Sequence, residues 1–192
     1  VREAGDTEAT FPDGTITEAR GDVAAIPIEL DNTREATLTV GGEDLGFEAN
    51  VTVRDDDQDG TVTVFFNTYA ASTASEGDLG DGGDVFSVSD DDEIERSRLS
   101  TGVSNLLDAT SYDMSLEAGG QNPNFDLLVL EPRETTAVRT WTAPRNRYGD
   151  LDAAEDVREG DGEWLTRTDE VAVGDTVVYE IRASGLEGAL DA

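Results

Sequence analysis

The 192-residue chain carries 44 acidic residues against 13 arginines, has no lysine, histidine or cysteine, and bears a formal net charge of −31. The absence of Cys and His excludes disulfides, thiolate nucleophiles, Ser-His-Asp catalysis and Cys-ligated zinc. The negative charge also excludes nucleic acid and anionic membranes as partners, because both are bound through clusters of Lys and Arg.

The charge pattern indicates adaptation to high salt. An excess of acidic over basic residues is typical of a halophile's protein. So are the use of Arg as the one type of basic residue and a low number of large apolar residues. At molar salt the Debye length is only about 3 Å, so repulsion among the carboxylates is largely screened. A high net charge is also typical of disordered chains, so disorder is the alternative. Because the apolar residues, 36% of the chain, fall into strand patterns, we expect a folded core.

The first predicted strands follow a polar N-terminal segment, residues 1–14. Alternation over 15–20 and 23–30 predicts two strands joined by a tight Gly21-Asp22 turn. With Arg20 this turn also spells an adhesion tripeptide of animal matrix proteins, but the Gly-Asp pair fits a hairpin turn. Pro27 predicts that the second strand lies at an edge or contains a bulge.

Residues 46–70 contain the clearest pattern of the chain. Apolar side chains alternate with polar ones over 47–54 and again over 61–69, and the acidic segment 55–60 lies between. This pattern predicts a β-hairpin with one buried and one solvated face. Residues 70–83 are small and polar without periodicity, so they are predicted to form a long loop that could carry a binding surface.

Further strands are predicted at 35–40, 85–88, 112–117 and 125–130, which gives about seven strands and no convincing helix in the first unit. The chain is therefore predicted to be all-β. Its first domain, 15–132, is predicted to be an immunoglobulin-like antiparallel β-sandwich that lacks the Cys pair.

A second, incomplete β unit with one short helix is predicted over 133–192. Its helix should span 151–159, with Asp150 as the cap. Three or four strands bury a core poorly, so this domain is expected to be truncated, continuing beyond the chain or docking on the sandwich. Trp141 and Trp164 are predicted to pack between the two units, with sugar stacking as the alternative.

Five short motifs occur in a fixed order: Ala19-Arg20-Gly21-Asp22-Val23-Ala24, Ala49-Asn50-Val51-Thr52-Val53, Phe66-Asn67-Thr68-Tyr69, Val138-Arg139-Thr140-Trp141-Thr142-Ala143-Pro144 and Val173-Gly174-Asp175-Thr176. From about Thr15 to the C-terminus, the set resembles the repeated extracellular region of haloarchaeal cell-surface glycoproteins, which are S-layer-like. The resemblance implies β-sandwich modules on the cell exterior, often N-glycosylated and sometimes followed by a membrane anchor. It implies no catalytic residues.

Two candidate sites lie on the predicted hairpin. Asp55, Asp57 and Asp59, with Gly60, match the first half of a calcium loop, although Phe66 stands where a bidentate Glu is needed. A hairpin turn on an acidic surface is the alternative, and the acidic run 90–93 could add ligands. Asn50 begins the sequon Asn50-Val51-Thr52 and should face outward, so it is the predicted glycosylation site.

We therefore expect a structural module of an extracellular, salt-adapted archaeal surface protein, with a surface adhesion or glycan- or partner-binding module as the alternative. An enzyme using carboxylates alone is a third hypothesis, but 44 acids can always supply a pair, and no catalytic residue is nominated. No cofactor is required, apart from the calcium hypothesis. The expected partners are other surface-protein subunits or further domains of the same chain. No segment here is apolar enough for membrane insertion. Val1 as the first residue predicts a processed chain or fragment, secreted or anchored through a region outside it.

Overall fold

The computed structural model describes residues 7–151, 154–160, 162–168 and 170–191. The chain divides into two compact units. The first contains residues up to 133 together with those from 184 onward, and the second contains residues 134–183. No helix among the described residues is long and apolar enough to cross a membrane.

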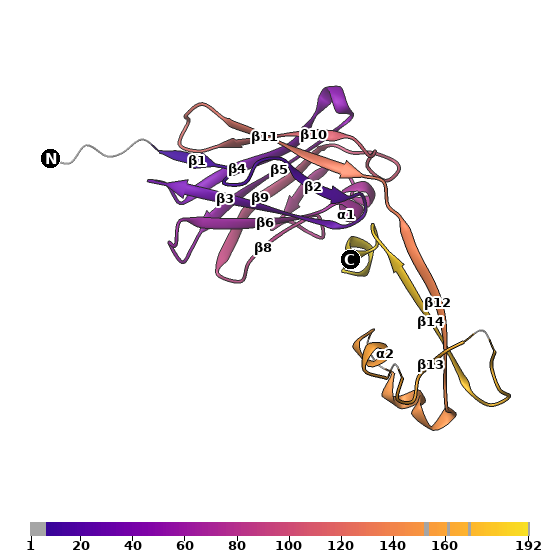
Figure 1. Cartoon of the computed structure of the whole chain (residues 1–192). Coiled ribbons are helices and arrows are strands. Elements are labelled where there is room, and N and C mark those ends of the chain that lie inside the picture. The colour runs from indigo at the N-terminus through magenta and orange to yellow at the C-terminus, as the bar shows by residue number, and fades with distance from the viewer. Residues whose placement is uncertain (1–6, 152–153, 161, 169, 192) are drawn as a thin grey trace. The chain divides into compact units, whose positions relative to one another are not determined.

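The first unit is a sandwich of two β-sheets (Figure 1). The smaller sheet has the order β1 (Glu8–Thr10), β3 (Val23–Asp31), β6 (Thr61–Asn67), β8 (Phe86–Val88). The larger sheet has the order β2 (Ile16–Ala19), β11 (Asn124–Glu131), β10 (Ser111–Glu117), β4 (Glu35–Gly42), β5 (Phe47–Asp55), β9 (Asp92–Thr101), β7 (Gly77–Gly80). Neighbouring strands are antiparallel, except that β2 pairs parallel to β11. The predicted all-β sandwich is confirmed.

Alternating apolar side chains from both sheets form one core. On β5 the residues Phe47, Ala49, Val51 and Val53 are fully buried, as the alternation predicted. Phe47 of the larger sheet lies 6.1 Å, between ring centroids, from Phe66 of the smaller sheet, and so joins the two layers. Burial of a large side chain of this kind contributes about 1.5–3 kcal/mol, so the core stabilises the sandwich mainly through such residues.

The predicted hairpin over residues 46–70 is wrong in its pairing. β5 pairs with β4 and β9, whereas β6 pairs with β3 and β8, so the acidic segment crosses from one sheet to the other. The Gly21-Asp22 turn likewise crosses between sheets, because β2 and β3 belong to different ones. Alternation identifies the buried face of a strand, but it does not identify the neighbouring strand. The hairpin partner of β5 is β4, which reaches it through the 3₁₀ turn η1 (Glu43–Leu45).

Three other expectations for this unit require correction. Part of the N-terminal segment is ordered into the sandwich, because β1 pairs with the end of β3. The predicted loop 70–83 contains most of the short helix α1 (Thr68–Thr73) and the strand β7. The prediction of no helix there is therefore wrong: Asn67 caps α1 by accepting hydrogen bonds from the backbone N–H groups of Tyr69 and Ala70.

Pro27 lies where β3 has a neighbour on one side. It is opposite Thr63 of β6, whereas β1 pairs with β3 only from Glu29 to Asp31. Proline has no N–H to donate to a second neighbouring strand. Because β3 is paired with β6 alone at this residue, the position of Pro27 agrees with the predicted edge position.

The second unit contains a three-stranded sheet, in the order β13 (Thr166–Arg167), β12 (Thr135–Ala143), β14 (Thr176–Ala183), with the 3₁₀ turn η2 (Arg145–Asp150) and the helix α2 (Ala154–Gly160). The short helix is confirmed with a shifted start. The carboxylate of Asp150 forms an ion pair with Arg147. The N–H groups that Asp150 was predicted to cap belong to residues 152–153, which lie outside the described residues.

Trp141 and Trp164 pack inside the second unit. Trp141 is buried with Ala143 and Leu165, and the cluster is extended by Leu151, Val157, Trp164 and Val178. Arg147 lies over the Trp164 ring, 5.6 Å from its centroid. Packing of these tryptophans between the units is therefore wrong, because the small unit has its own apolar cluster.

The C-terminal segment, defined here as residues 184–191, belongs to the first unit and ends in the helix α3 (Glu187–Leu190). Assigning all of 133–192 to the second domain is therefore wrong, because the chain leaves the sandwich after Arg133 and returns to it at Ser184. The second unit is an insertion between two parts of the first.

Candidate functional site

The acidic segment between β5 and β6 is organised around Asp55. This side chain is 2% exposed. Its Oδ1 accepts a hydrogen bond from the Gln58 N–H at 2.5 Å, and its Oδ2 accepts one from the Gly60 N–H at 3.0 Å. Gln58 and Gly60 have φ values of 67° and 87°, a conformation that favours Gly. The carboxylate therefore holds the loop in a tight turn.

Asp57 and Asp92 lie beside Asp55. One carboxylate oxygen from each of the three residues lies within 4.8 Å of the others. Asp92 begins β9, directly opposite Asp55 in the β5–β9 register. The Oδ1 atom of Asp92 is shielded from solvent and has no hydrogen-bond partner among the described residues. Three carboxylates from two segments thus converge at one end of the larger sheet.

Electrostatics at this cluster oppose ionisation. Burial raises the pKa of Asp92, and the nearby carboxylates of Asp57 and Asp55 raise it further, while a backbone hydrogen bond from Asp56 acts in the opposite direction. A hard divalent cation would relieve the repulsion, and carboxylate oxygens are the donors that calcium prefers. The donor set therefore fits calcium chemically.

The Asp59 carboxylate is outside this cluster and contacts Thr61. Its Oδ1 accepts hydrogen bonds from the N–H and the hydroxyl of Thr61, each at 2.7 Å. The structure thus brings together two of the predicted ligands, Asp55 and Asp57, and adds Asp92 from the acidic run 90–93 in place of Asp59. Asp92 takes the place of Asp59 in this cluster because β9 pairs with β5, a pairing that the sequence does not predict.

Asn50 lies on β5 in the middle of the larger sheet. It is opposite Thr39 of β4 and Arg98 of β9, and it is half-buried. Its amide lies 3.5 Å from the Ser100 hydroxyl. The sequon residue Thr52 is only 2% exposed, with its hydroxyl 2.9 Å from that of Thr37. Asn50 faces away from the core as expected, and its glycosylation stays a prediction.

A polar junction that the sequence did not indicate binds the C-terminal segment to the sandwich. Asp22 is 8% exposed, and its carboxylate accepts hydrogen bonds from the N–H groups of Gly185, at 2.7 Å, and Glu187, at 2.9 Å. The Asn67 amide donates to the Gly188 carbonyl at 2.9 Å, and the Gly188 N–H donates to the Gly21 carbonyl at 3.0 Å. Asp22 is thus engaged inside the unit, which argues against the adhesion tripeptide.

The second unit has a charged network on β12 and β14. Glu180 accepts from Arg182 at 2.6 Å, from Arg139 at 3.3 Å and from the Trp141 indole N–H at 3.2 Å. The hydrogen bond from Arg182, followed by those from Trp141 and Arg139, lowers the pKa of Glu180. This network ties the two strands together beside the small apolar cluster.

Comparison with known proteins places this chain in a family. Residues 1–119 match the family described as "Domain of unknown function (DUF7827)". The chain belongs to this family. Over its full length, this DUF7827 chain is 43% identical to a cell surface glycoprotein of Haloferax gibbonsii. It is 36% identical to cell surface glycoproteins 1 and 2 of Haloarcula hispanica, again over its full length.

The DUF7827 chain spans 21–22% of the length of these curated relatives. The similarity confirms the predicted resemblance to haloarchaeal cell-surface glycoproteins and the predicted extracellular location at the cell surface.

Proposed function

We propose that this chain is a structural, non-catalytic module of an S-layer-like surface protein, in which an immunoglobulin-like sandwich spaces and mechanically supports the outer coat at high salt. The observation that carries the proposal is the similarity, over the full chain, to three haloarchaeal cell surface glycoproteins.

The strand pairing of the first unit supports the mechanical part of the proposal. β2 runs parallel to β11 with Ile16 opposite Leu128 and Ala19 opposite Glu131, and the Arg20 N–H donates to the Glu131 carbonyl at 2.9 Å. Once the C-terminal segment has been released from Asp22 and Asn67, tension between the residues that precede β2 and those that follow β11 would pull two parallel strands in opposite directions. Their hydrogen bonds would then be loaded together in shear and could not open one at a time.

The surface charge supports the high-salt part. Most acidic side chains of the described residues are exposed, whereas the core is apolar. Such a surface stays hydrated and soluble when salt screens its repulsion. A glycan on Asn50 would add to the hydrated layer over the outer face of the larger sheet.

The experiment is a replacement in Haloferax gibbonsii. The segment of its cell surface glycoprotein that matches this chain is deleted, and the cell envelope is imaged by electron cryotomography at growth salt. Deletion should produce gaps or altered spacing in the coat, and insertion of residues 1–192 should restore it. An undisturbed coat after deletion, with the shortened glycoprotein still exported, would refute a structural role.

A further inference from the structure

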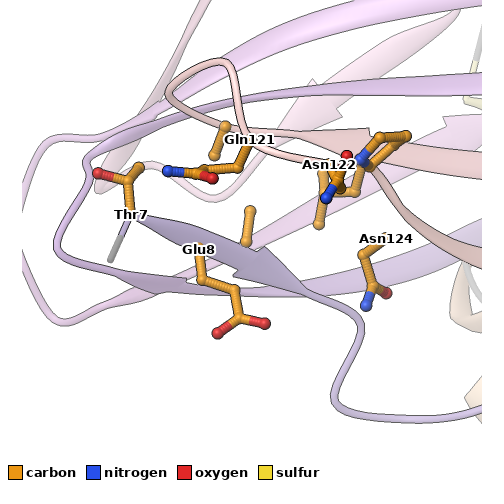
Figure 2. A pocket seen from close by; sticks show the side chains of 9 residues that line it. Thr7, Glu8, Gln121, Asn122 and Asn124 are labelled. Atoms are coloured by element: carbon orange, nitrogen blue, oxygen red, sulfur yellow. The ribbon is translucent and has the colours of Figure 1, made fainter. Parts of the chain in front are cut away.

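A hollow of about 340 Å³ lies in the first unit between the edge strand β1 and the turn that joins β10 to β11. Its floor is closed by Ala9, Leu116 and Ala118, which belong to the core and expose little surface to the hollow. Its rim is polar. Figure 2 shows Thr7 and Glu8 on the β1 side and the carboxamides of Gln121, Asn122 and Asn124 on the facing side.

The two walls of this hollow are held against each other by the fold. The turn is set by Gly119 and Gly120, with φ values of 57° and 73°, and by the hydrogen bond from the Gln121 N–H to the Ala118 carbonyl at 3.1 Å. A methyl group at Gly119 would come within 2.6 Å of the Thr7 methyl, so Thr7 lies directly on the turn. The hollow is therefore formed before any ligand arrives.

The rim concentrates neutral amides in a chain dominated by acids. The sequence contains seven Asn and two Gln, and three of these nine lie within residues 121–124. The side chains of Gln121, Asn122 and Asn124 make no hydrogen bond to the rest of the described chain, so their donors and acceptors are available to a ligand. A carboxamide offers both a carbonyl acceptor and two N–H donors.

The composition of the rim selects among ligand classes. A divalent cation needs several carboxylates and an anion needs arginine; among the described residues that line the hollow, Glu8 is the one acid and there is no arginine. Hydroxyl groups both donate and accept hydrogen bonds, as carboxamides do. We propose that this hollow binds a neutral saccharide, one ring of a glycan whose hydroxyls are bound by Gln121, Asn122 and Asn124.

Glu8 and Ala9 lie on opposite faces of β1, and Figure 2 shows the Glu8 carboxylate directed away from Gln121 and Asn122. The polar groups that face a ligand here are therefore the carboxamides, which favour a neutral hydroxyl-bearing molecule. This binding role goes beyond structural support and uses residues that neither the acid cluster nor the C-terminal segment employs.

The test is a titration of the full ¹⁵N-labelled chain in molar salt, followed through the side-chain amide signals of Gln121, Asn122 and Asn124. Methyl α-mannoside and methyl α-glucoside serve as single-ring probes, and a glycopeptide with a neutral N-linked chain serves as the attached form. At least one neutral probe should shift these signals. Shifts with the glycopeptide alone would identify the ligand as an attached glycan, and shifts with a methyl glycoside would show that one ring suffices.

Variants distinguish the site from general surface effects. Gln121→Ala and Asn122→Ala should each weaken binding by about fivefold, the effect of one neutral hydrogen bond. The exposed Asn105→Ala should leave it unchanged. The proposal is wrong if none of the neutral probes shifts these signals, if calcium chloride alone reproduces the shifts, or if Gln121→Ala and Asn122→Ala bind as Asn105→Ala does.

Discussion

Replacement of Asp22 by Ala should release the C-terminal segment from the sandwich. The substitution removes an almost buried carboxylate that accepts two backbone N–H groups at 2.7 and 2.9 Å, and it leaves the N–H groups of Gly185 and Glu187 without their acceptor. A hydrogen bond to a charged group contributes about 1.5–3 kcal/mol, and the Glu187 bond is partly exposed, so we expect a loss of about 3 kcal/mol. That loss corresponds to about a hundredfold increase in local opening.

Amide hydrogen exchange measures this opening at the Gly188 N–H, which is bonded to the Gly21 carbonyl at 3.0 Å. The matched control is Asp13→Ala, which removes the same charge from an exposed carboxylate with no hydrogen bond among the described residues. Both variants remove one negative charge, so the control accounts for the general effect of a lower net charge. If the Gly188 amide is protected equally in the two variants, Asp22 does not hold the segment.

The other predictions concern charge. Calcium should raise the melting temperature at fixed ionic strength; Asp57→Asn and Asp92→Asn should abolish that increase, and Asp59→Asn should preserve it. A melting temperature that calorimetry finds unchanged by calcium would show that the acidic segment is a turn without a bound cation. Without calcium, the raised pKa of Asp92 means that its neutral form stabilises the fold below the ordinary value of 3.8, a contribution lost as the pH rises through the raised pKa. Asp92→Asn should therefore be more stable than the parent at neutral pH and equal to it in acid, as denaturant titrations would show. Glu180 has the opposite sign, because its lowered pKa gives stability that is present above 4.5 and lost as the pH falls through the lowered value, so Glu180→Gln should weaken β12–β14 at neutral pH in amide exchange. Dialysis from molar salt to dilute buffer should unfold the chain, and an unchanged circular dichroism spectrum would contradict the screening argument.

Sequence alone predicted most strands of the core but missed β9, whose Ile94 and Leu99 are buried, and it did not predict which strands are neighbours. The buried residues of β5 and β6 followed from period-two alternation, a local property of each strand. Their assignment to different sheets depends on contacts with β3, β4, β8 and β9, which alternation does not encode. The helix α1 is six residues long and too short to show a helical period, although Asn67 before it was a readable cap.

The candidate sites likewise contain residues whose proximity the sequence predicts and residues whose proximity it does not. Asp55 and Asp57 are two residues apart, so their proximity was readable, whereas Asp92 joins them only through the register of β5 with β9. Asp22 and Gly185 are separated by 163 positions, and neither carries a local signal for the other. Resemblance to a family indicated the cell surface, but contacts of such sequence separation required coordinates.

The insertion of the second unit creates a reserve of chain length. The chain leaves and re-enters the sandwich at touching positions, since a methyl group on Gly185 would lie 2.4 Å from Cβ of Arg133. While Asp22 and Asn67 hold the C-terminal segment, a pull on that segment passes directly into the β2–β3 turn, and residues 134–183 carry no tension. Opening of the junction would transfer the pull to these roughly 50 residues, which could extend by at most about 170 Å before the sandwich itself is strained. Under tension the chain would therefore lengthen in steps, first at the junction and then in the second unit, before the strands of the sandwich separate.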